Sequence, residues 1–285
     1  MKLIEGKQRQ ISPGFSVTRL LPSVAARSVG PFVFFDRFGP VFLPPGHGLD
    51  VRPHPHIGLC TVTYLFEGGQ VHRDSLGSVQ EIKPGAINWM TAGRGIVHSE
   101  RTSPQMRAAG HRMHGVQSWV ALPKSDELIE PSFEHAASDA LPLMDAPGIR
   151  LRLLAGHGYG LIAPVRVLSP LFYVDIEFSG DSRFALGHEH QERAMYVVSG
   201  SVMSGGQRYG EGALVVFDPD DEAVISACEP ARTLVFGGAP LDGPRHLWWN
   251  FVSSSKERIE QAKADWRMMR IGRIPGDDEF IPLPD

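Results

Sequence analysis

Two pairs of metal-binding side chains, each interrupted by a single residue, constrain the fold of this chain most. His54 and His56 form the first pair, and His98 and Glu100 form the second. In an extended strand, residues i and i+2 point to the same face and lie about 6.5–7 Å apart along the chain. Two neighbouring strands could therefore direct three imidazoles and one carboxylate at one point. This spacing predicts a single metal site inside a β-structure, with Glu100 also serving as a base.

Short apolar segments separated by glycine and proline turns surround these pairs. The chain has 285 residues, including 31 glycines and 23 prolines, and 42% of its residues are hydrophobic. Segments 60–66, 86–90 and 114–123 are rich in β-branched and aromatic residues, which favour strands. Short strands at close intervals are typical of a sandwich or barrel. We therefore expect an all-β protein of one large or two medium domains.

The pattern of the first half recurs in weaker form in the second half. A His-x-His motif at 188–190 precedes a tyrosine-containing strand segment, as the motif at 54–56 does. Such self-similarity indicates an internal duplication. The polar, proline-containing stretch 124–147 separates the halves. We predict an N-terminal metal-binding domain at 1–135 and a C-terminal domain at 136–285.

One helix is expected, near the C-terminus. The Ser-Ser-Lys-Glu sequence at 254–257 fits a capping box. The apolar residues Ile259, Ala262, Trp266 and Met269 then follow at helical spacing and form one stripe. We expect this helix to cover a barrel or a domain seam.

Charge and cysteine content exclude several classes of protein. The formal net charge is −4 and charged residues are scattered, so direct nucleic-acid or membrane binding is not expected. Cys60 and Cys228 are the two cysteines, which excludes a disulfide framework. The sequence has no apolar run of transmembrane length and begins without a signal-peptide pattern. We predict a cytoplasmic protein.

Several blocks of the sequence resemble the pirin family of the cupin superfamily. They include PHPHIG at 53–58, HRDS at 72–75 and the highly specific WMTAGRGIVHSE at 89–100. The resemblance is densest over 31–123 and looser in the C-terminal half. It implies a bicupin fold, with two antiparallel jelly-roll β-barrels and a C-terminal helix.

The resemblance also implies a metal held by His54, His56, His98 and Glu100. One divalent ion is expected, with Fe(II) favoured, although Mn, Ni, Cu or Zn would also suit this set of donors. Four protein ligands leave two octahedral positions open. Many family members have glutamate at the position of Cys60, and this difference could alter the surroundings of the metal without removing a ligand.

Some pirins are quercetin 2,3-dioxygenases, so the resemblance implies oxidation of a small aromatic, flavonol-like substrate by O2. Glu100 would accept the proton of the substrate's hydroxyl group, and the ring would open with loss of carbon monoxide. The alternative is a regulatory protein that responds to metal or redox state and binds a protein partner, as eukaryotic relatives bind transcription factors. A structural bicupin without metal is a third interpretation.

The second half lacks a full set of ligands in the expected pattern. His188 and His190 match the first cupin motif, but Arg193 stands where its glutamate is expected, and Glu192 is displaced by one position. A shift of one residue on a strand turns a side chain to the opposite face. The stretch 212–222 offers carboxylates and no histidine. We therefore do not expect a metal in the second half.

Two further pairs of side chains each share a face of one expected strand. His72 and Asp74 form one pair, for which we expect structural hydrogen bonding. Gln117 and Trp119 form the other pair, for which core packing is favoured over lining of the cavity.

Overall fold

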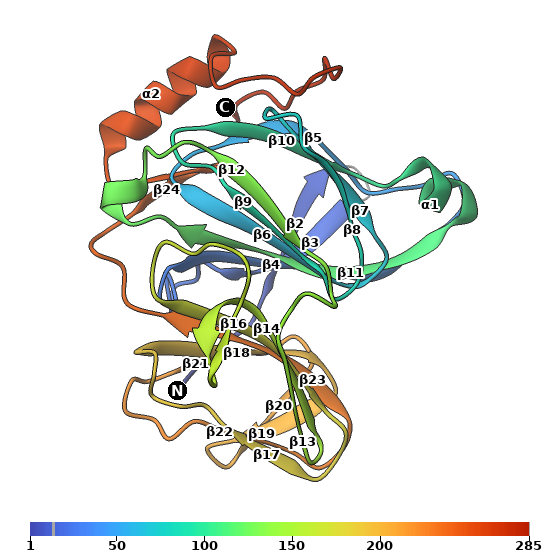
Figure 1. Cartoon of the computed structure of the whole chain (residues 1–285), viewed down its shortest axis with the longest axis vertical. Helices are drawn as coiled ribbons and strands as arrows, with labels where there is room; N and C mark the ends of the chain where they lie inside the picture. The colour runs from blue at the N-terminus through green and yellow to red at the C-terminus, as the bar shows by residue number, and fades with distance from the viewer. Residues whose placement is uncertain (13–14, 285) are drawn as a thin grey trace. The chain divides into compact units, whose positions relative to one another are not determined.

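A computed structural model describes residues 1–12 and 15–284, and this part of the chain is mostly antiparallel β-structure with two α-helices (Figure 1). The chain forms two compact units, neither of which is continuous in sequence. Unit 1 comprises Met1–Gln8, Thr18–Phe35 and Asp139–Pro240, and unit 2 comprises Arg9–Val17, Asp36–Ser138 and Leu241–Asp285. The predicted domains 1–135 and 136–285 remain a prediction. The compact units are divided differently, because each of them contains segments from before and after residue 135.

Two sheets contain most strands of the first half, and a hairpin follows near the C-terminus. The seven-stranded sheet has the order β12-β9-β6-β11-β4-β3-β2, and the four-stranded sheet has the order β5-β10-β7-β8. The bounds of these strands and of the hairpin β24–β25 are β2 Lys7–Ser12, β3 Phe15–Leu21, β4 Phe32–Leu43, β5 Asp50–His56, β6 Leu59–Glu67, β7 Gln70–Asp74, β8 Val79–Ile82, β9 Ile87–Thr91, β10 Ile96–Arg101, β11 His111–Ala121, β12 Ser132–Ala136, β24 His246–Trp248 and β25 Phe251–Ser253.

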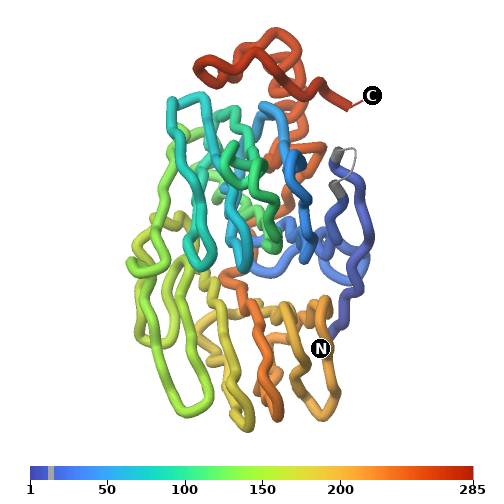
Figure 2. The backbone as a smooth tube through the Cα atoms, turned by 90° about the vertical axis from the view of Figure 1, so that its right-hand side faces the viewer, coloured from blue at the N-terminus to red at the C-terminus, as the bar shows by residue number. Residues whose placement is uncertain are grey.

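Two further sheets contain the strands of the second half, together with the first strand of the chain. The larger sheet has the order β1-β21-β18-β23-β16-β14-β13, with β15 paired to β14, and the smaller has the order β17-β22-β19-β20. Long antiparallel hairpins of this part are visible in Figure 2. The bounds are β1 Lys2–Ile4, β13 Leu143–Ala146, β14 Ile149–Gly158, β15 Leu161–Ile162, β16 Leu171–Phe178, β17 Ser182–Ala185, β18 Glu192–Ser199, β19 Ser201–Ser204, β20 Gln207–Gly210, β21 Leu214–Phe217, β22 Val224–Ala227 and β23 Ala231–Gly238.

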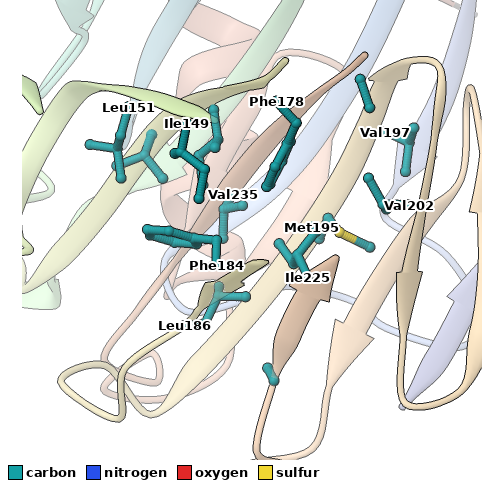
Figure 3. Packing of buried hydrophobic residues seen from close by; sticks show 14 of the residues in the cluster. Ile149, Leu151, Phe178, Phe184, Leu186, Met195, Val197, Val202, Ile225 and Val235 are labelled. Atoms are coloured by element: carbon teal, nitrogen blue, oxygen red, sulfur yellow. The ribbon is translucent and has the colours of Figure 1, made fainter. Parts of the chain in front are cut away.

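The core of unit 1 follows from the alternation of apolar residues along its strands. On β14, Ile149, Leu151 and Leu153 are buried, while Arg150 between them is exposed. Side chains from both sheets of this unit, including Phe184 on the smaller sheet, meet in one apolar cluster (Figure 3). Burying one such leucine completely contributes about 1.5–3 kcal/mol. The cluster therefore holds the two sheets together.

The structure confirms a mostly β fold and corrects one part of the expectation. The sheets end in edge strands, such as β12 and β2 in the seven-stranded sheet, so they are not closed barrels. Packing of two open sheets across an apolar interior buries the same faces that barrel closure would bury. The turn-rich sequence could not distinguish these two arrangements.

Helix α2, Lys256–Arg267, confirms the predicted C-terminal helix. Ser255 is its N-cap and accepts a hydrogen bond from the backbone N–H of Arg258. The buried stripe of Ile259, Ala262 and Trp266 packs in a cluster with Phe251 and other residues of unit 2. Three residues of the expected stripe therefore lie on the helix and cover apolar surface, whereas Met269 follows the end of the helix at a positive φ of 54° and packs against the same cluster.

A second helix, α1 at Pro104–Ala109, was not predicted from the sequence. It has six residues, with Ser103 as the N-cap and proline at its start. This Ser-Pro pair is the local signal that favours a helix start. No helix within residues 1–12 and 15–284 is long and apolar enough to cross a membrane.

Candidate metal centre

The two predicted pairs of side chains lie on neighbouring antiparallel strands of the four-stranded sheet. His54 and His56 are on β5, and His98 is on β10. In the register of these strands, His98 is opposite His54, and Ile96 is opposite His56. Glu100 is opposite Val51, so the pairing shifts by one residue here and the extra residue lies in β5. The sheet thus brings the three imidazoles to one face, as their spacing predicted.

Tight turns join the strands at this end of the sheet. Gly58 has a φ of 67°, and a Cβ at this position would lie 2.0 Å from the carbonyl oxygen of Val252. Its N–H donates to the carbonyl of Gly93, in the loop before β10. Only glycine tolerates both the positive φ and the close approach of backbone at this point. This hydrogen bond links the loops that follow His56 and precede His98.

The ligand atoms of three histidines lie close enough together to hold one metal ion. One ligand atom from each of His54, His56 and His98 lies within 4.8 Å of the others. The backbone carbonyls of Arg52 and Asn250 accept hydrogen bonds from Nδ1 of His54 (2.8 Å) and Nδ1 of His56 (3.1 Å). A carbonyl can only accept, so these bonds assign the proton to Nδ1 and leave the lone pair on Nε2.

The Nε2 atoms of His56 and His98 are buried, and neither has a hydrogen-bond partner among the described residues. A buried polar atom without a partner costs about 1–3 kcal/mol, and such atoms usually mark a bound water, ion or ligand. A metal ion would satisfy both lone pairs. The three imidazoles therefore fit a first-row transition metal by donor type, by proximity and by their unsatisfied atoms.

Burial keeps these imidazoles neutral. His56 and His98 are each 1% exposed. Burial lowers the pKa of both well below the usual value of 6.5, and neighbouring histidines lower it further. Burial also lowers the pKa of His54, while the charge of Glu100 opposes that shift. Neutral imidazole is the form that binds metal, so the site is ready to bind at neutral pH.

Glu100 is buried beside the three histidines but is not a member of the group whose ligand atoms lie within 4.8 Å of one another. Its Oε1 accepts a hydrogen bond of 3.1 Å from Nε2 of Gln117 and lies 3.9 Å from Nδ1 of His98. Trp119, two residues further along β11, packs edge-on against the ring of His56. Gln117 and Trp119 thus share a face of β11 that is directed at the site. From the sequence, core packing had been favoured for this pair over lining of the cavity.

His72 and Asp74 extend the site by a chain of hydrogen bonds. Nε2 of His72 lies 2.9 Å from Oδ2 of Asp74, and Nδ1 of His72 lies 3.4 Å from Nδ1 of His98. Asp74 also accepts hydrogen bonds from the backbone N–H groups of Leu76 and Ser78. Burial raises the pKa of Asp74, but the interactions with His72 and Ser78 outweigh it, so the pKa lies below its usual value. The sequence predicted a structural bond between His72 and Asp74 but not the contact with His98.

Cys60 lies on β6, outside the group of three histidines. Its Sγ lies 3.4 Å from Oγ1 of Thr91, and burial raises the pKa of the thiol to about 12. At neutral pH it is therefore a protonated, buried thiol. Cys228, in contrast, is exposed.

A second group of metal-binding side chains lies in unit 1. It comprises His157, Glu189 and His190, whose ligand atoms also lie within 4.8 Å of one another. The sequence pattern pointed to His188 and His190, and His188 is not part of this group. His157 is the second-last residue of β14, and the sequence pattern did not single it out.

The fold and the buried histidines together define a cupin protein with two cupin domains and a three-histidine candidate metal centre in the first. The chain belongs to the pirin family. The family model "Pirin" matches residues 14–120, and the model "Pirin C-terminal cupin domain" matches residues 173–272. This confirms the family resemblance and the bicupin organisation.

Relatives and solved structures agree with this assignment. A pirin-like protein of Caulobacter vibrioides is 49% identical over 288 residues, covering 99% of each chain. A Pseudomonas aeruginosa protein that carries the provisional name quercetin 2,3-dioxygenase is 38% identical, covering 96% of this chain and 86% of its own. The crystal structure of a quercetin 2,3-dioxygenase from Acinetobacter baumannii matches with a TM-score of 0.91 at 35% identity, covering 100% of this chain and 95% of that one.

Proposed function

We propose that this pirin is a metal-dependent dioxygenase of the quercetin 2,3-dioxygenase type, acting on flavonol-like substrates with O2. The observation that carries the proposal is the buried group of His54, His56 and His98, in which Nε2 of His56 and of His98 has no hydrogen-bond partner among the described residues and a carboxylate lies beside the rings. The similarity to an Acinetobacter baumannii protein solved as a quercetin 2,3-dioxygenase supports the choice of reaction.

In this proposal, His54, His56 and His98 hold one divalent ion, with Glu100 as the fourth ligand and Fe(II) as the favoured metal. A bound ion of this kind supplies Lewis-acid polarisation of substrate oxygens and, for iron, electrons for chemistry with O2. Glu100 follows His98 by two residues on β10, whose pairing with β7 is regular here, so its carboxylate would approach the ion with a small change of side-chain torsion.

The protein groups would perform the proton transfer and the orientation of the substrate. Glu100 would accept the proton of the flavonol 3-hydroxyl through the carboxylate oxygen that Gln117 leaves free. Gln117 is a positioning residue, since its amide fixes the other carboxylate oxygen. Overall, one flavonol and one O2 would give one ring-opened ester and one carbon monoxide.

The cavity beneath α2 is not the site of this reaction. It has a volume of about 350 Å³, and Pro53 and Val97 contribute to its lining. These residues alternate with the histidines along β5 and β10, so their side chains point to the opposite face of the sheet. The flavonol would bind on the histidine face.

Anaerobic loading of the protein with Fe(II), followed by addition of quercetin and O2, tests the proposal. We expect loss of quercetin absorbance with one O2 consumed and one carbon monoxide released per substrate. His98→Ala should abolish turnover and metal retention together. Metal-loaded wild-type protein that oxidises no member of a flavonol panel would rule out this function and favour a non-enzymatic, regulatory role.

A further inference from the structure

We propose that His157, Glu189 and His190 form a second metal site, which binds a divalent first-row transition ion in unit 1. The proposal is independent of the dioxygenase activity, because all three residues belong to unit 1 and the three-histidine centre belongs to unit 2. It also differs from the sequence pattern, which paired His190 with His188.

Different elements of one unit supply the three side chains. His157 lies near the end of β14, and Glu189 and His190 lie in the segment between β17 and β18. The approach of their ligand atoms to within 4.8 Å therefore results from the tertiary fold. Two imidazoles and a carboxylate are a set of donors that Zn²⁺ and its neighbours in the first row bind in proteins.

His190 is held in an orientation suited to binding. It is 7% exposed, and its ring stacks on Phe172 at a centroid distance of 4.8 Å. Its Nε2 donates a hydrogen bond of 2.9 Å to the backbone carbonyl of His157. This bond assigns the proton to Nε2 and leaves the lone pair on Nδ1, so that one ring nitrogen is free for a metal, as in the histidines of the first centre.

The other two ligands already lie at a separation that a metal requires. Nε2 of His157 lies 3.5 Å from Oε1 of Glu189. Metal–ligand bonds of about 2.1 Å in a tetrahedral site place neighbouring ligand atoms roughly 3.4 Å apart. Both side chains are exposed, at 44% and 50%. They can therefore shift toward His190, from within 4.8 Å to the separation that a shared ion requires, without disturbing the core.

Arg193 fixes the loop that carries Glu189. It is 1% exposed, and its guanidinium donates to backbone carbonyls of this loop and of the loop that follows β21. These carbonyls belong to Leu186, Gly187, Asp218, Pro219 and Asp221. The arginine that replaces the expected cupin glutamate therefore organises the loop, and the ligands come from His157 and Glu189 instead.

The exposure of His157 and Glu189 predicts the character of the site. Three protein ligands leave at least one position for water, and the carboxylate offsets part of the charge of the ion. We expect a site that exchanges its metal with solvent more readily than the buried first centre. A bound ion would link the end of β14 to the segment before β18.

Metal stoichiometry of the full-length, metal-free protein tests the proposal with Zn²⁺ as the probe. After equilibrium dialysis and elemental analysis, we expect two equivalents for the wild type and one for His157→Ala and for Glu189→Ala. Each substitution should weaken the second equivalent by at least about tenfold. Both residues are exposed, so both variants should fold, and circular dichroism would verify this.

His188→Ala is the matched control, because it removes a histidine from the same loop outside the group. It should retain two equivalents. Binding of a single equivalent by the wild type would overturn the proposal, as would unchanged binding by both His157→Ala and Glu189→Ala. Loss of the second equivalent in His188→Ala with retention in His157→Ala would assign the site to the sequence motif and also overturn it.

Discussion

Nδ1 of His72 lies 3.4 Å from Nδ1 of His98, a member of the buried three-histidine group, while the opposite side of the His72 ring faces Asp74. The carboxylate can only accept, so Nε2 of His72 carries the proton and Nδ1 of His72 is an acceptor. Nδ1 of His98 must then donate, which leaves the Nε2 lone pair of His98 for a metal. One buried carboxylate thus sets the tautomers of two rings.

Asp74→Asn should weaken metal binding because it reverses this assignment. An asparagine amide can donate to Nε2 of His72. The proton of the His72 ring would then move to its Nδ1, where it would face the Nδ1–H of His98. We expect a loss of metal affinity of about 10- to 100-fold, measured by competition with a chelator. Arg73→Ala, at the exposed neighbouring position, is the matched control and should leave the affinity unchanged. Equal affinity in wild type and Asp74→Asn would show that the chain of bonds does not act on the site.

The location of the site could be predicted from the sequence, whereas the distance of the Glu100 carboxylate from the imidazoles could not. The i, i+2 spacing of His54 and His56 requires only that the segment be a strand, and local composition supports that. Glu100 follows His98 by two residues on β10, whose pairing with β7 is regular, so the same alternation places its carboxylate on the histidine face. Strand spacing does not set the side-chain torsion that decides how near the carboxylate comes to the imidazoles, so the role of Glu100 as a ligand stays a prediction.

The group of His157, Glu189 and His190 shows more clearly that sequence spacing alone does not predict which side chains meet. His188 and His190 are two residues apart, but the segment that contains them is not a strand, so the alternation rule does not apply. His157 is more than 30 positions away from its partners and reaches them only through the fold of unit 1. The local periodicity of a sequence carries no information about such a contact.

The metal-free protein should lose stability as the pH falls below about 6.5. Burial lowers the folded-state pKa of His54, His56 and His98, so the unfolded chain takes up protons first. Their stabilising effect is complete above 6.5 and declines by about 1.4 kcal/mol per histidine for each pH unit between the unfolded and folded pKa values. Urea unfolding at pH 8, 6 and 5 measures this decline.

A variant with one titrating group fewer provides the control for this pH dependence. His56→Gln should unfold with a smaller change in free energy between pH 6 and pH 5 than the wild type. If the two proteins show the same change, the buried histidine is not responsible for the loss of stability.

The two cysteines should differ sharply in reactivity. The pKa of Cys60 is raised to about 12 by burial, while Cys228 is exposed. Since the thiolate is the reactive form, a disulfide reagent such as Ellman's reagent should titrate one thiol rapidly in the native protein and both after denaturation. Cys228→Ser should remove the rapid phase. A rapid phase that persists in that variant would contradict the buried, protonated state of Cys60.

Glu100→Gln should separate metal binding from catalysis. The substitution keeps the shape of the side chain but removes its negative charge and its ability to accept a proton. Three imidazoles remain to hold the ion, so metal should be retained with lower affinity, while flavonol turnover should fall by about 10²- to 10⁴-fold. Gln117→Ala, which removes only the bond to Oε1 of Glu100, should lower turnover less and leave metal content unchanged. Turnover at the wild-type rate in metal-loaded Glu100→Gln would exclude Glu100 as the base, because no proton acceptor would then remain on that side chain.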